Sequence, residues 1–353
     1  MRPFFALSII SALIACHAYA ELTPVREYLL KPPRDRRTLF AMAVTPEQDV
    51  LSFVANDDGT WRLSRVRHWT DKQPLEEALT VPGLVNGRAG WSKYSGVFWS
   101  ADMFVTPDSQ FVACIISAYP KGGGNREDLV SVVSLSQFRL VSTLHPSAVT
   151  QLDGNYRSYR LDRRGYLVIN ASTPFPRHPG DDPFFGGSLH RLAILTLPGL
   201  DIGNRCEYSE WMRSGSVVRR ENESDCATVL RDSGSSSLDE FSKTLLEAGE
   251  VSNRDEKTRP PECAFLTYDS RVSRDGRFRR DTCTDGHRGF FGNFVVSHAV
   301  ENVFLVRTGQ KLGFIKQKSD NPALSRFATI EDRDYLLLME GGTRLTVYQI
   351  KVE

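Results

Sequence analysis

The chain offers little from which a membrane-spanning helix, a nucleic-acid site or a zinc cluster could be built. After the first twenty residues, no apolar run reaches the roughly 18 residues of a membrane span. The charges balance, with 44 Lys and Arg against 43 Asp and Glu, so the basic stripe of a nucleic-acid-binding protein is missing. Only six cysteines occur, and none of them has the Cys-x-x-Cys spacing of a zinc site. The sequence therefore predicts neither a nucleic-acid partner nor a transmembrane segment.

The short motifs of common enzymes are also missing. The sequence contains no His-Glu-x-x-His zinc motif and no Gly-x-Ser-x-Gly nucleophile elbow. The GGGN stretch at 122–125 lacks the Gly-Lys-Ser/Thr that completes a phosphate loop. The glycines at 286, 289 and 292 do not follow a strand that opens a helix, as a dinucleotide site requires. We therefore expect no cofactor and no metal, and a binding protein rather than an enzyme.

The first twenty residues have the pattern of a secretory signal peptide. A short basic start is followed by an apolar run from Phe4 to Ala15 and then by the small-x-small sequence Ala18-Tyr19-Ala20. Cleavage before Glu21 would give a secreted or periplasmic chain. The alternative is a lipoprotein, because Leu13-Ile14-Ala15-Cys16 is similar to a bacterial lipobox, with a lipid anchor on Cys16. Either interpretation places the mature protein outside the cytoplasm.

Four cysteines occur as two pairs, each spaced by twenty residues. They are Cys206, Cys226, Cys263 and Cys283. In an oxidising compartment they predict two disulfides, each worth about 3 kcal/mol if it closes a loop of about 20 residues. Three connectivities are open, and spacing alone does not choose among them. Cys114 lies in an apolar strand, FVACIISAY, and is expected to be a buried free thiol.

A degenerate motif recurs along the chain and predicts the fold. Each copy is a short strand, a polar turn and a second apolar strand. The copies are VTPEQDVLSF, VTPDSQFVAC, LDRRGYLVI, VSRDGRFRR and ATIEDRDYLLLM, starting at residues 44, 105, 161, 272 and 328. The spacing is about 56 residues, or twice that between the third and fourth copies. Periods above about 50 residues in an all-β chain are typical of propellers.

Two further strands follow each copy except the last, so each unit is a four-stranded antiparallel blade of strands A to D. The last unit lacks its fourth strand, and the N-terminal segment 25–32 is a strand without a unit. We expect that segment to complete the last blade and so to close the ring. The fold class is therefore all-β, a single propeller of five blades over 21–353, with six blades as the alternative.

One stretch, 206–262, does not have the pattern of a blade, and we expect a small helical insertion there. Ser236 or Ser237 is a candidate N-cap. The apolar positions that follow share one helical face; they are Leu238, Phe241, Leu245 and Leu246.

The repeated motif resembles the blade signature of bacterial YVTN-type and TolB-type β-propellers, broad relatives of WD-repeat proteins. Val105–Cys114 and Val272–Phe278 carry the resemblance most clearly, and Val44–Phe53 and Leu161–Ile169 more loosely. The Gly-His and Trp-Asp pairs of true WD repeats are missing. The resemblance implies a propeller and, most often among such proteins, a binding or scaffold role, although the fold alone does not transfer a function.

Strand parity predicts where a ligand would bind. The A–B and C–D turns share one face of the ring, and the B–C and D–A connections share the other. Four long segments, 90–100, 119–128, 174–187 and 284–299, fall on that second face and are rich in aromatic residues. The expected ligand-binding residues are Trp91, Tyr94, Trp99, Phe184, Phe185, Arg288 and Phe290. The alternative is that these aromatic side chains only pack on one another.

Three functions stay open at this point. The first is a secreted, non-catalytic propeller that binds a protein, peptide or glycan through this aromatic face. The second is a hydrolase of glycosidase or lactonase type, with a metal or acid–base site drawn from His178, Asp181, His287 and His298. The third is a purely structural component of the cell envelope, anchored by lipid on Cys16.

Overall fold

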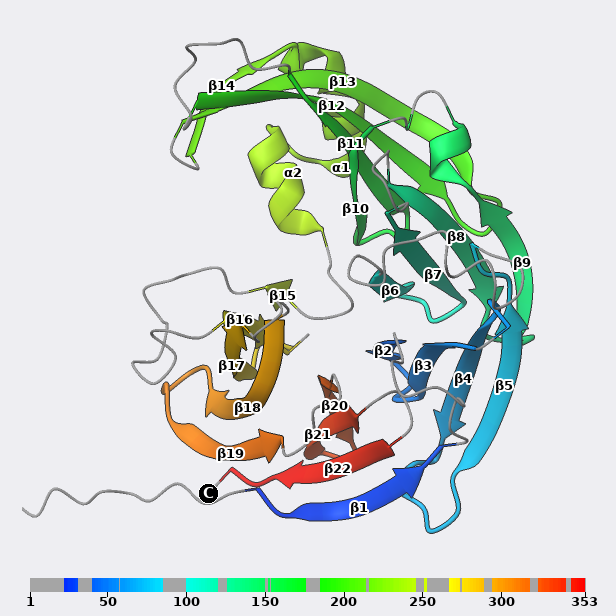
Figure 1. Ribbon diagram of the computed structural model, residues 1–353, viewed down its shortest axis with the longest axis vertical. Helices are drawn as coiled ribbons and strands as arrows, with labels where there is room; N and C mark the ends of the chain where they lie inside the picture. The colour runs from blue at the N-terminus through cyan, green and yellow to red at the C-terminus, as the bar shows by residue number, and fades with distance from the viewer. Residues whose placement is uncertain are drawn as a thin grey trace, which may run out of the picture.

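The protein forms a ring of five antiparallel sheets, which confirms the predicted β-propeller of five blades (Figure 1). This computed structural model describes residues 22–30, 40–56, 58–84, 100–119, 126–149, 152, 154–175, 185–213, 216–245, 251–252, 267–273, 275–288, 294–317, 323–340 and 344–352. Three sheets have four strands, and the two that form blades 3 and 4 have five.

The blades follow one another along the chain, with strand A of each blade nearest the centre of the ring (Figure 1). Blade 1 contains β2 (Phe40–Val44), β3 (Val50–Ala55), β4 (Trp61–Arg67) and β5 (Leu75–Val81). Blade 2 contains β6 (Ser100–Val105), β7 (Phe111–Ala118), β8 (Glu127–Ser134) and β9 (Arg139–Leu144), followed by the 3-10 turn η2 (Pro146–Ala148). Blade 3 contains β10 (Tyr156–Leu161), β11 (Leu167–Pro174), β12 (Phe185–Thr196), β13 (Asp201–Arg213) and β14 (Ser216–Glu221).

The remaining elements complete the ring. After β14 come the 3-10 turn η4 (Glu223–Cys226) and two helices, α1 (Ala227–Ser233) and α2 (Leu238–Thr244). Blade 4 contains β15 (Val251–Ser252), β16 (Thr267–Val272), β17 (Phe278–Arg288), β18 (Phe294–Leu305) and β19 (Lys311–Gln317). Blade 5 contains β20 (Ala323–Ile330), β21 (Arg333–Glu340) and β22 (Arg344–Ile350).

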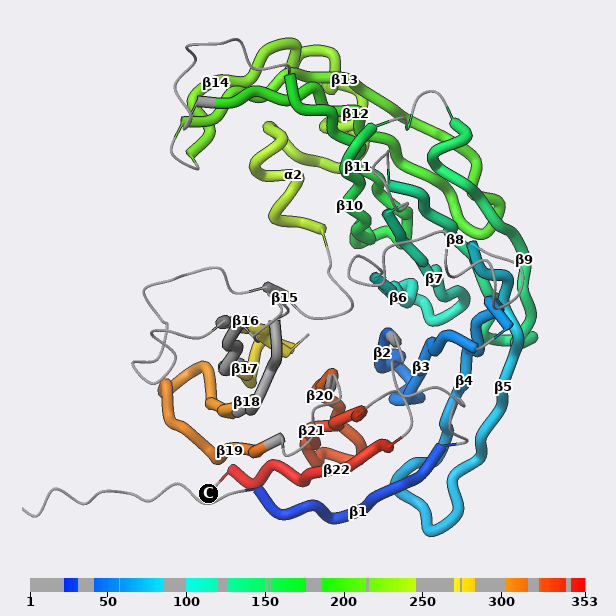
Figure 2. Tube along the Cα trace, in the orientation of Figure 1, coloured from blue at the N-terminus to red at the C-terminus, as the bar shows by residue number. Residues whose placement is uncertain are grey.

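The N-terminal strand closes the ring, as the missing fourth strand of the last unit predicts. β1 (Pro24–Leu29) pairs antiparallel with β22, so the fifth blade has the order β1-β22-β21-β20. Figure 2 shows the two ends of the chain meeting there, blue beside red. Tyr28 in β1 donates hydrogen bonds to the carbonyl oxygens of Trp69 and Asp71, which tie the closing strand to blade 1.

The repeated motif makes the A–B turns, and in four blades a polar oxygen at the same position of the repeat organises the turn. The hydroxyls of Thr45, Thr106 and Ser273 accept a hydrogen bond from a backbone N–H four or five residues later, at 2.9–3.0 Å. In blade 3 the carboxylate of Asp162 accepts hydrogen bonds from the backbone N–H groups of Arg164 and Tyr166, two and four residues later, both at 2.9 Å. These turns and the C–D turns form one face of the ring, here called the turn face; the opposite face, reached by the B–C and D–A connections, is the loop face.

Four of the five boundaries between blades are filled by apolar side chains. The buried clusters join blades 1 and 2, blades 2 and 3, blades 4 and 5, and blades 5 and 1. Among the described residues, the fifth cluster joins blade 3 to the helices instead of to blade 4. Figure 1 shows α1 and α2 between blades 3 and 4, a boundary that we call the seam.

The helices are held on blade 3 by local chemistry that the sequence partly predicts. Ser237 is the N-cap of α2, because its side chain accepts a hydrogen bond from the Glu240 N–H. Leu238 and Phe241 are buried against the sheet, as the helical spacing predicts. The Cys206–Cys226 disulfide links β13 to the end of η4. This bridge is one of the predicted pairings, and Cys114 is buried and free, as expected.

Two predicted boundaries differ from the structure. The stretch from 206 begins as strand, because β13 continues to Arg213 and β14 forms a hairpin with it before the helices start. The predicted loop at 284–299 is largely a hairpin, since β17 runs to Arg288 and β18 starts at Phe294. Both strands were underestimated because glycine and charged residues interrupt their apolar alternation. Cys263 and the Cys283 side chain lie outside the described residues, so their disulfide stays a prediction.

Candidate binding site at the seam between blades 3 and 4

Most of the aromatic residues that the sequence predicts for the loop face lie outside the described residues. This holds for Trp91, Tyr94, Trp99, Phe184 and Phe290. The backbone of Phe185 starts β12 and that of Arg288 ends β17, so both positions are at the loop-face ends of their strands, and their side chains are outside what the structure describes. The binding role of these seven residues stays a prediction.

The histidines and the aspartate predicted for the hydrolase alternative, or at least their side chains, also lie outside the described residues. His178 and Asp181 lie outside the described residues. His287 is in β17 and His298 in β18, where the backbone of His298 is directly opposite Asp285, but the side chains of both histidines are outside the description. No group of three His, Cys, Asp or Glu residues that could hold a metal occurs within the described part of the chain. The catalytic interpretation therefore stays a prediction.

The described residues contain a polar cluster on blade 3 that the sequence did not single out. Its members lie on one face of the sheet, toward the seam, and they are Asn170, His190, Tyr208, Glu210 and Arg220. We call this set the seam cluster. Alternation along β12 and β13 places it on the same face as Leu192 and Cys206, which pack against the helices.

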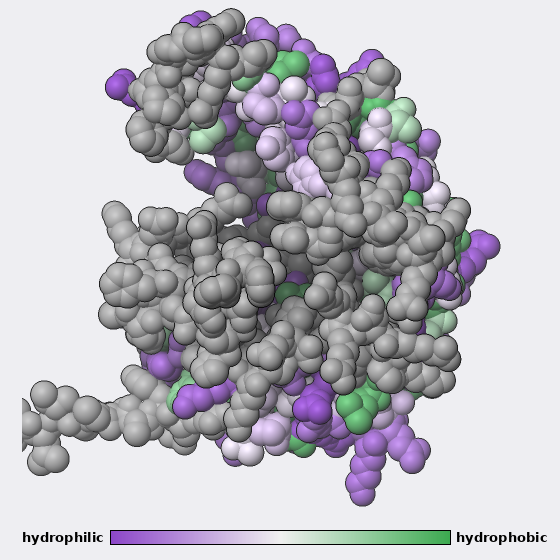
Figure 3. Space-filling model, viewed as in Figure 1, coloured by the Kyte–Doolittle hydropathy of each residue, from purple (hydrophilic) through white to green (hydrophobic). Residues whose placement is uncertain are grey.

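The seam face of blade 3 is thus divided into two halves. Near the turn face it is apolar and covered by α1 and α2. Near the loop face it is polar and carries the seam cluster, because β12 and β13 continue past the helices toward the B–C connection. In Figure 3 the outline of the molecule is indented on the side of the helices, and hydrophilic side chains border the upper edge of the indentation.

Stacking and hydrogen bonds hold the seam cluster in place. The His190 and Tyr208 rings stack with centroids 4.8 Å apart and planes 7° apart. Asn170 Oδ1 is 3.4 Å from His190 Nδ1, and the Asn170 side chain also hydrogen-bonds Tyr208. Arg220 Nε donates to Glu210 Oε2 at 2.9 Å, and Arg220 Nη2 is 3.1 Å from Asp239 of α2. The cluster joins the last two strands of blade 3 to the helical insertion.

Burial sets the protonation states of the cluster. Burial lowers the pKa of His190, and this outweighs the opposing effect of Glu210. Burial, with the Glu210 charge, raises the pKa of Tyr208 to about 12. At neutral pH the imidazole is therefore neutral and the phenol protonated, while Glu210 and Arg220 form an ion pair. The side chains of His190 and Glu210 keep 15% and 12% of their exposure, so a small ligand group can reach them.

An aromatic pair covers the opposite face of the same strands. Phe175, just after β11, and Trp211 in β13 have ring centroids 5.1 Å apart. Gly187 lies beneath them, and a Cβ atom there would come within 2.6 Å of Phe175 and 2.7 Å of Trp211. Glycine is required at this position, because a larger residue would push both rings away. This packing stiffens the loop-face end of blade 3, which carries the seam cluster.

The face of blade 4 that does not pack on blade 5 is polar as well. Asp281 in β17 is fully buried, and Ser270 Oγ donates to its Oδ1 at 2.7 Å. Arg279 Nη2 is 3.1 Å from Asp281 Oδ2, and its guanidinium lies 4.5 Å from the centre of the Phe304 ring. Among the described residues, both sides of the seam thus present charged groups.

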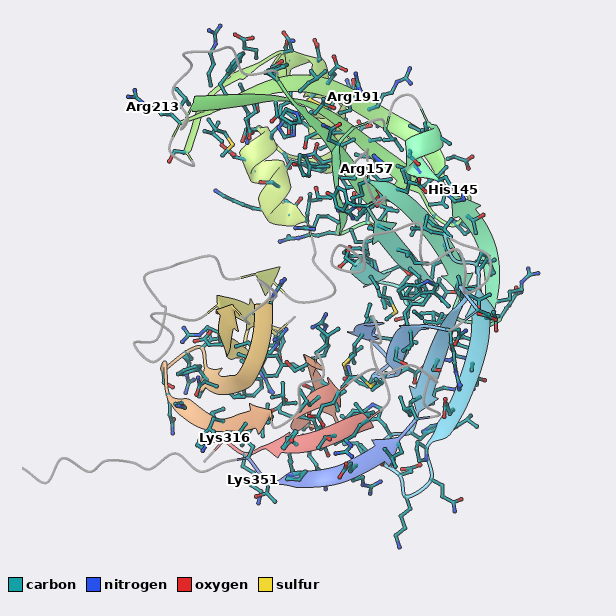
Figure 4. All side chains as sticks on the ribbon, viewed as in Figure 1. His145, Arg157, Arg191, Arg213, Lys316 and Lys351 are labelled. Atoms are coloured by element: carbon teal, nitrogen blue, oxygen red, sulfur yellow. A yellow bond between two sulfur atoms is a disulfide. The ribbon has the colours of Figure 1, made fainter. Side chains whose placement is uncertain are left out.

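A second polar network, between blades 2 and 3, shows how a purely structural arrangement differs. Asp128 is fully buried and accepts hydrogen bonds from Arg126 Nε at 2.7 Å, Arg157 Nε at 2.6 Å and Tyr159 Oη at 2.6 Å. Arg157 also donates to the carbonyl oxygens of Gly154 and Arg126, and Figure 4 shows it among the strands of blade 3. With both carboxylate oxygens occupied and no exposure, this network has no room for a ligand.

Comparisons with known proteins add only low-level likenesses. No family model matches the chain, and no curated protein matches it. Among solved structures, the C-terminal WD40 domain of Sif2 is 6% identical over 95% of this chain and 99% of that one, with a TM-score of 0.33. A thermostable family-43 glycoside hydrolase is 9% identical over 92% of this chain and 93% of that one, with a TM-score of 0.31. The polysaccharide lyase Uly1 is 10% identical over 97% of this chain and 86% of that one, also with a TM-score of 0.31. Likenesses at this level carry no argument about function.

Proposed function

We propose that the protein is an extracytoplasmic, non-catalytic β-propeller that binds a protein, peptide or glycan on its loop face. The observation that supports this most is that the connections on the two faces of the ring differ. On the turn face the described A–B turns are short and are held by their own polar side chains. The loop face receives the aromatic connections predicted from the sequence and the polar half of the seam.

Three other features agree with a binding role outside the cytoplasm. The disulfide between Cys206 and Cys226 suits an oxidising compartment. No helix among the described residues is long and apolar enough to cross a membrane. The first twenty residues have the pattern of a signal peptide. The resemblance to YVTN-type and TolB-type propellers also favours a binding role, since a binding or scaffold role is the commonest among such proteins.

Replacing Trp91 and Trp99 together with Ala is expected to abolish ligand binding while changing the free energy of unfolding by only about 1–2 kcal/mol, as for exposed positions. The ligand class is found first by a thermal-shift screen of the mature chain against glycans, peptides, lactones and divalent metals, because a ligand that binds only the folded state raises the melting temperature. The affinity of the double variant for that ligand is then measured by calorimetry.

Phe138→Ala is the matched control for this pair. Phe138 lies in the turn between β8 and β9, on the turn face, so its replacement should leave the affinity unchanged. Unfolding of the Trp91/Trp99 variant would mean that these rings are core residues, and equal loss of binding in the Phe138 variant would mean that the loop face is not the site.

The mature N-terminus tests the proposed localisation. Mass spectrometry of the protein purified from its native host is expected to find a chain that starts at Glu21. A chain that starts at a lipid-modified Cys16 would contradict the secreted form and would support the lipoprotein alternative. Retention of Met1 would contradict export through a cleaved signal in either form.

A further inference from the structure

We propose that His190 and Glu210 of the seam cluster form a subsite for neighbouring hydroxyl groups of a neutral saccharide. This rests on the proposed binding function and names the ligand class for one part of the loop face. His190 Nε2 and Glu210 Oε1 are 4.0 Å apart, which is too far for a direct hydrogen bond. Two neighbouring hydroxyl oxygens beside this gap, each about 2.8 Å from one of the two atoms, match that spacing.

The hydrogen bonds of Asn170 determine which groups face that gap. The Asn170 side chain has one amide nitrogen and one carbonyl oxygen. Its Oδ1 lies 3.4 Å from His190 Nδ1. Because a carbonyl oxygen can only accept a hydrogen bond, Nδ1–H is the donor in this contact. In the neutral imidazole Nε2 is then an acceptor.

Two acceptors therefore lie opposite each other without a donor. Glu210 Oε1 is a carboxylate oxygen, and its partner Oε2 is already bonded by Arg220. Within the described residues, neither Nε2 nor Oε1 has a hydrogen-bond donor of its own. Such a pair binds a group that offers two O–H or N–H bonds close together. Two adjacent hydroxyls of a sugar ring, one donating to each acceptor, meet this requirement.

Charge leaves a cationic group as the competing ligand. Arg220 bonds Glu210 directly and its guanidinium lies 5.9 Å from the centre of the Tyr208 ring, so one positive charge stands beside the gap. Glu223 and Asp239 lie on the helical side of the cluster, and Asp239 is 3.1 Å from Arg220. Arg220 already neutralises Glu210 by direct contact, and a hydroxyl pair needs no further charge, so we assign the subsite to a neutral ligand, and the test below includes a cationic peptide.

The test uses the mature full-length chain and an array of neutral oligosaccharides, followed by calorimetry with the tightest binder. Glu210→Gln is expected to raise the Kd at least about tenfold, as for loss of a hydrogen bond to a charged group. His190→Phe keeps the stack on Tyr208 and removes both ring nitrogens, and a similar loss is expected. Both variants should keep a melting temperature within about 4 °C of the wild type.

Glu207→Gln is the matched control. Glu207 is in the same strand, faces the opposite side of the sheet and pairs with Arg191 at 2.9 Å, so its replacement should change the Kd less than about twofold. The subsite is overturned if no neutral oligosaccharide binds, if Glu210→Gln and Glu207→Gln behave alike, or if a polylysine peptide binds the wild type more tightly than any sugar.

The Trp91/Trp99 variant separates failure of the subsite from failure of the proposed function. Loss of sugar binding in that variant, with full binding by Glu210→Gln, would overturn the subsite and leave the loop-face function standing. The reverse result would establish the subsite and overturn the role of the aromatic connections.

Discussion

Replacing Asp128 with Ala is expected to lower the free energy of unfolding by about 3–5 kcal/mol, because it leaves the guanidinium of Arg157 buried without its counter-charge. The side chains of Asp128 and Arg157 are both completely shielded from solvent, so no water can replace the lost oxygen. Asp128 is also where three donors from two blades meet. Urea unfolding followed by circular dichroism at neutral pH measures the change.

Glu76→Ala is the control for this prediction. Glu76 pairs with Arg62 at 2.7 Å, but each side chain keeps 26% of its exposure, so solvent can take the place of the partner. The expected loss is at most about 1 kcal/mol. Equal effects of the two substitutions would show that the blade 2–3 network does not contribute more than a surface ion pair.

Acid should weaken the same network. Burial alone would raise the pKa of Asp128, but Arg126 and the hydrogen bonds from Ser117 and Tyr159 outweigh it and hold the pKa below its usual value. The unfolded value is about 3.9. The stabilisation is therefore fully present above about pH 5 and is lost as the pH falls through the lower, folded-state value. The unfolding free energy of the wild type should fall more steeply below pH 4 than that of Asp128→Asn.

Removing the Cys206–Cys226 bridge is expected to cost about 3 kcal/mol, because the bridge closes a loop with a sequence separation of 20 residues and so restricts the unfolded chain. The double Ser variant and the wild type are compared by urea unfolding with and without a reducing agent. Mass spectrometry of a digest of the unreduced protein should contain the peptide that joins the two cysteines.

Cys114→Ala serves as the control, because Cys114 is buried and free and should not affect the response to reduction. The Cys206/Cys226 variant should lose the part of that response that belongs to this bridge. If reduction destabilises the double Ser variant as much as the wild type, the stabilising disulfide lies elsewhere, with Cys263–Cys283 as the remaining candidate.

The regular part of the propeller was predictable because each blade repeats the same local chemistry. Val-Thr-Pro, Leu-Asp and Val-Ser each end an inner strand with a residue whose oxygen can hold the A–B turn. The missing fourth strand of the last unit pointed to β1. Ser237 marked the start of α2. In each of these cases a few adjacent residues determine the local structure, so it can be predicted from a single sequence.

The seam cluster was not predictable, because no local pattern marks it. Tyr208, Glu210 and Arg220 lie in a stretch where apolar alternation stops, and among the described residues this face of blade 3 packs on the helices. The pattern consequently indicated an insertion rather than strands. His190 comes from a different strand and meets Tyr208 only through the register of β12 with β13.

The closure of the ring by β1 has a consequence for how the chain reaches its folded state. β1 and β22 are neighbours in one sheet, yet nearly the whole chain separates them. This pairing has the largest loop-closure cost in the molecule and is expected to form late. Until then the edge of β22 is open to strands from other chains. Slow closure, rather than instability of any blade, is therefore the step at which the folding chain is most exposed to aggregation.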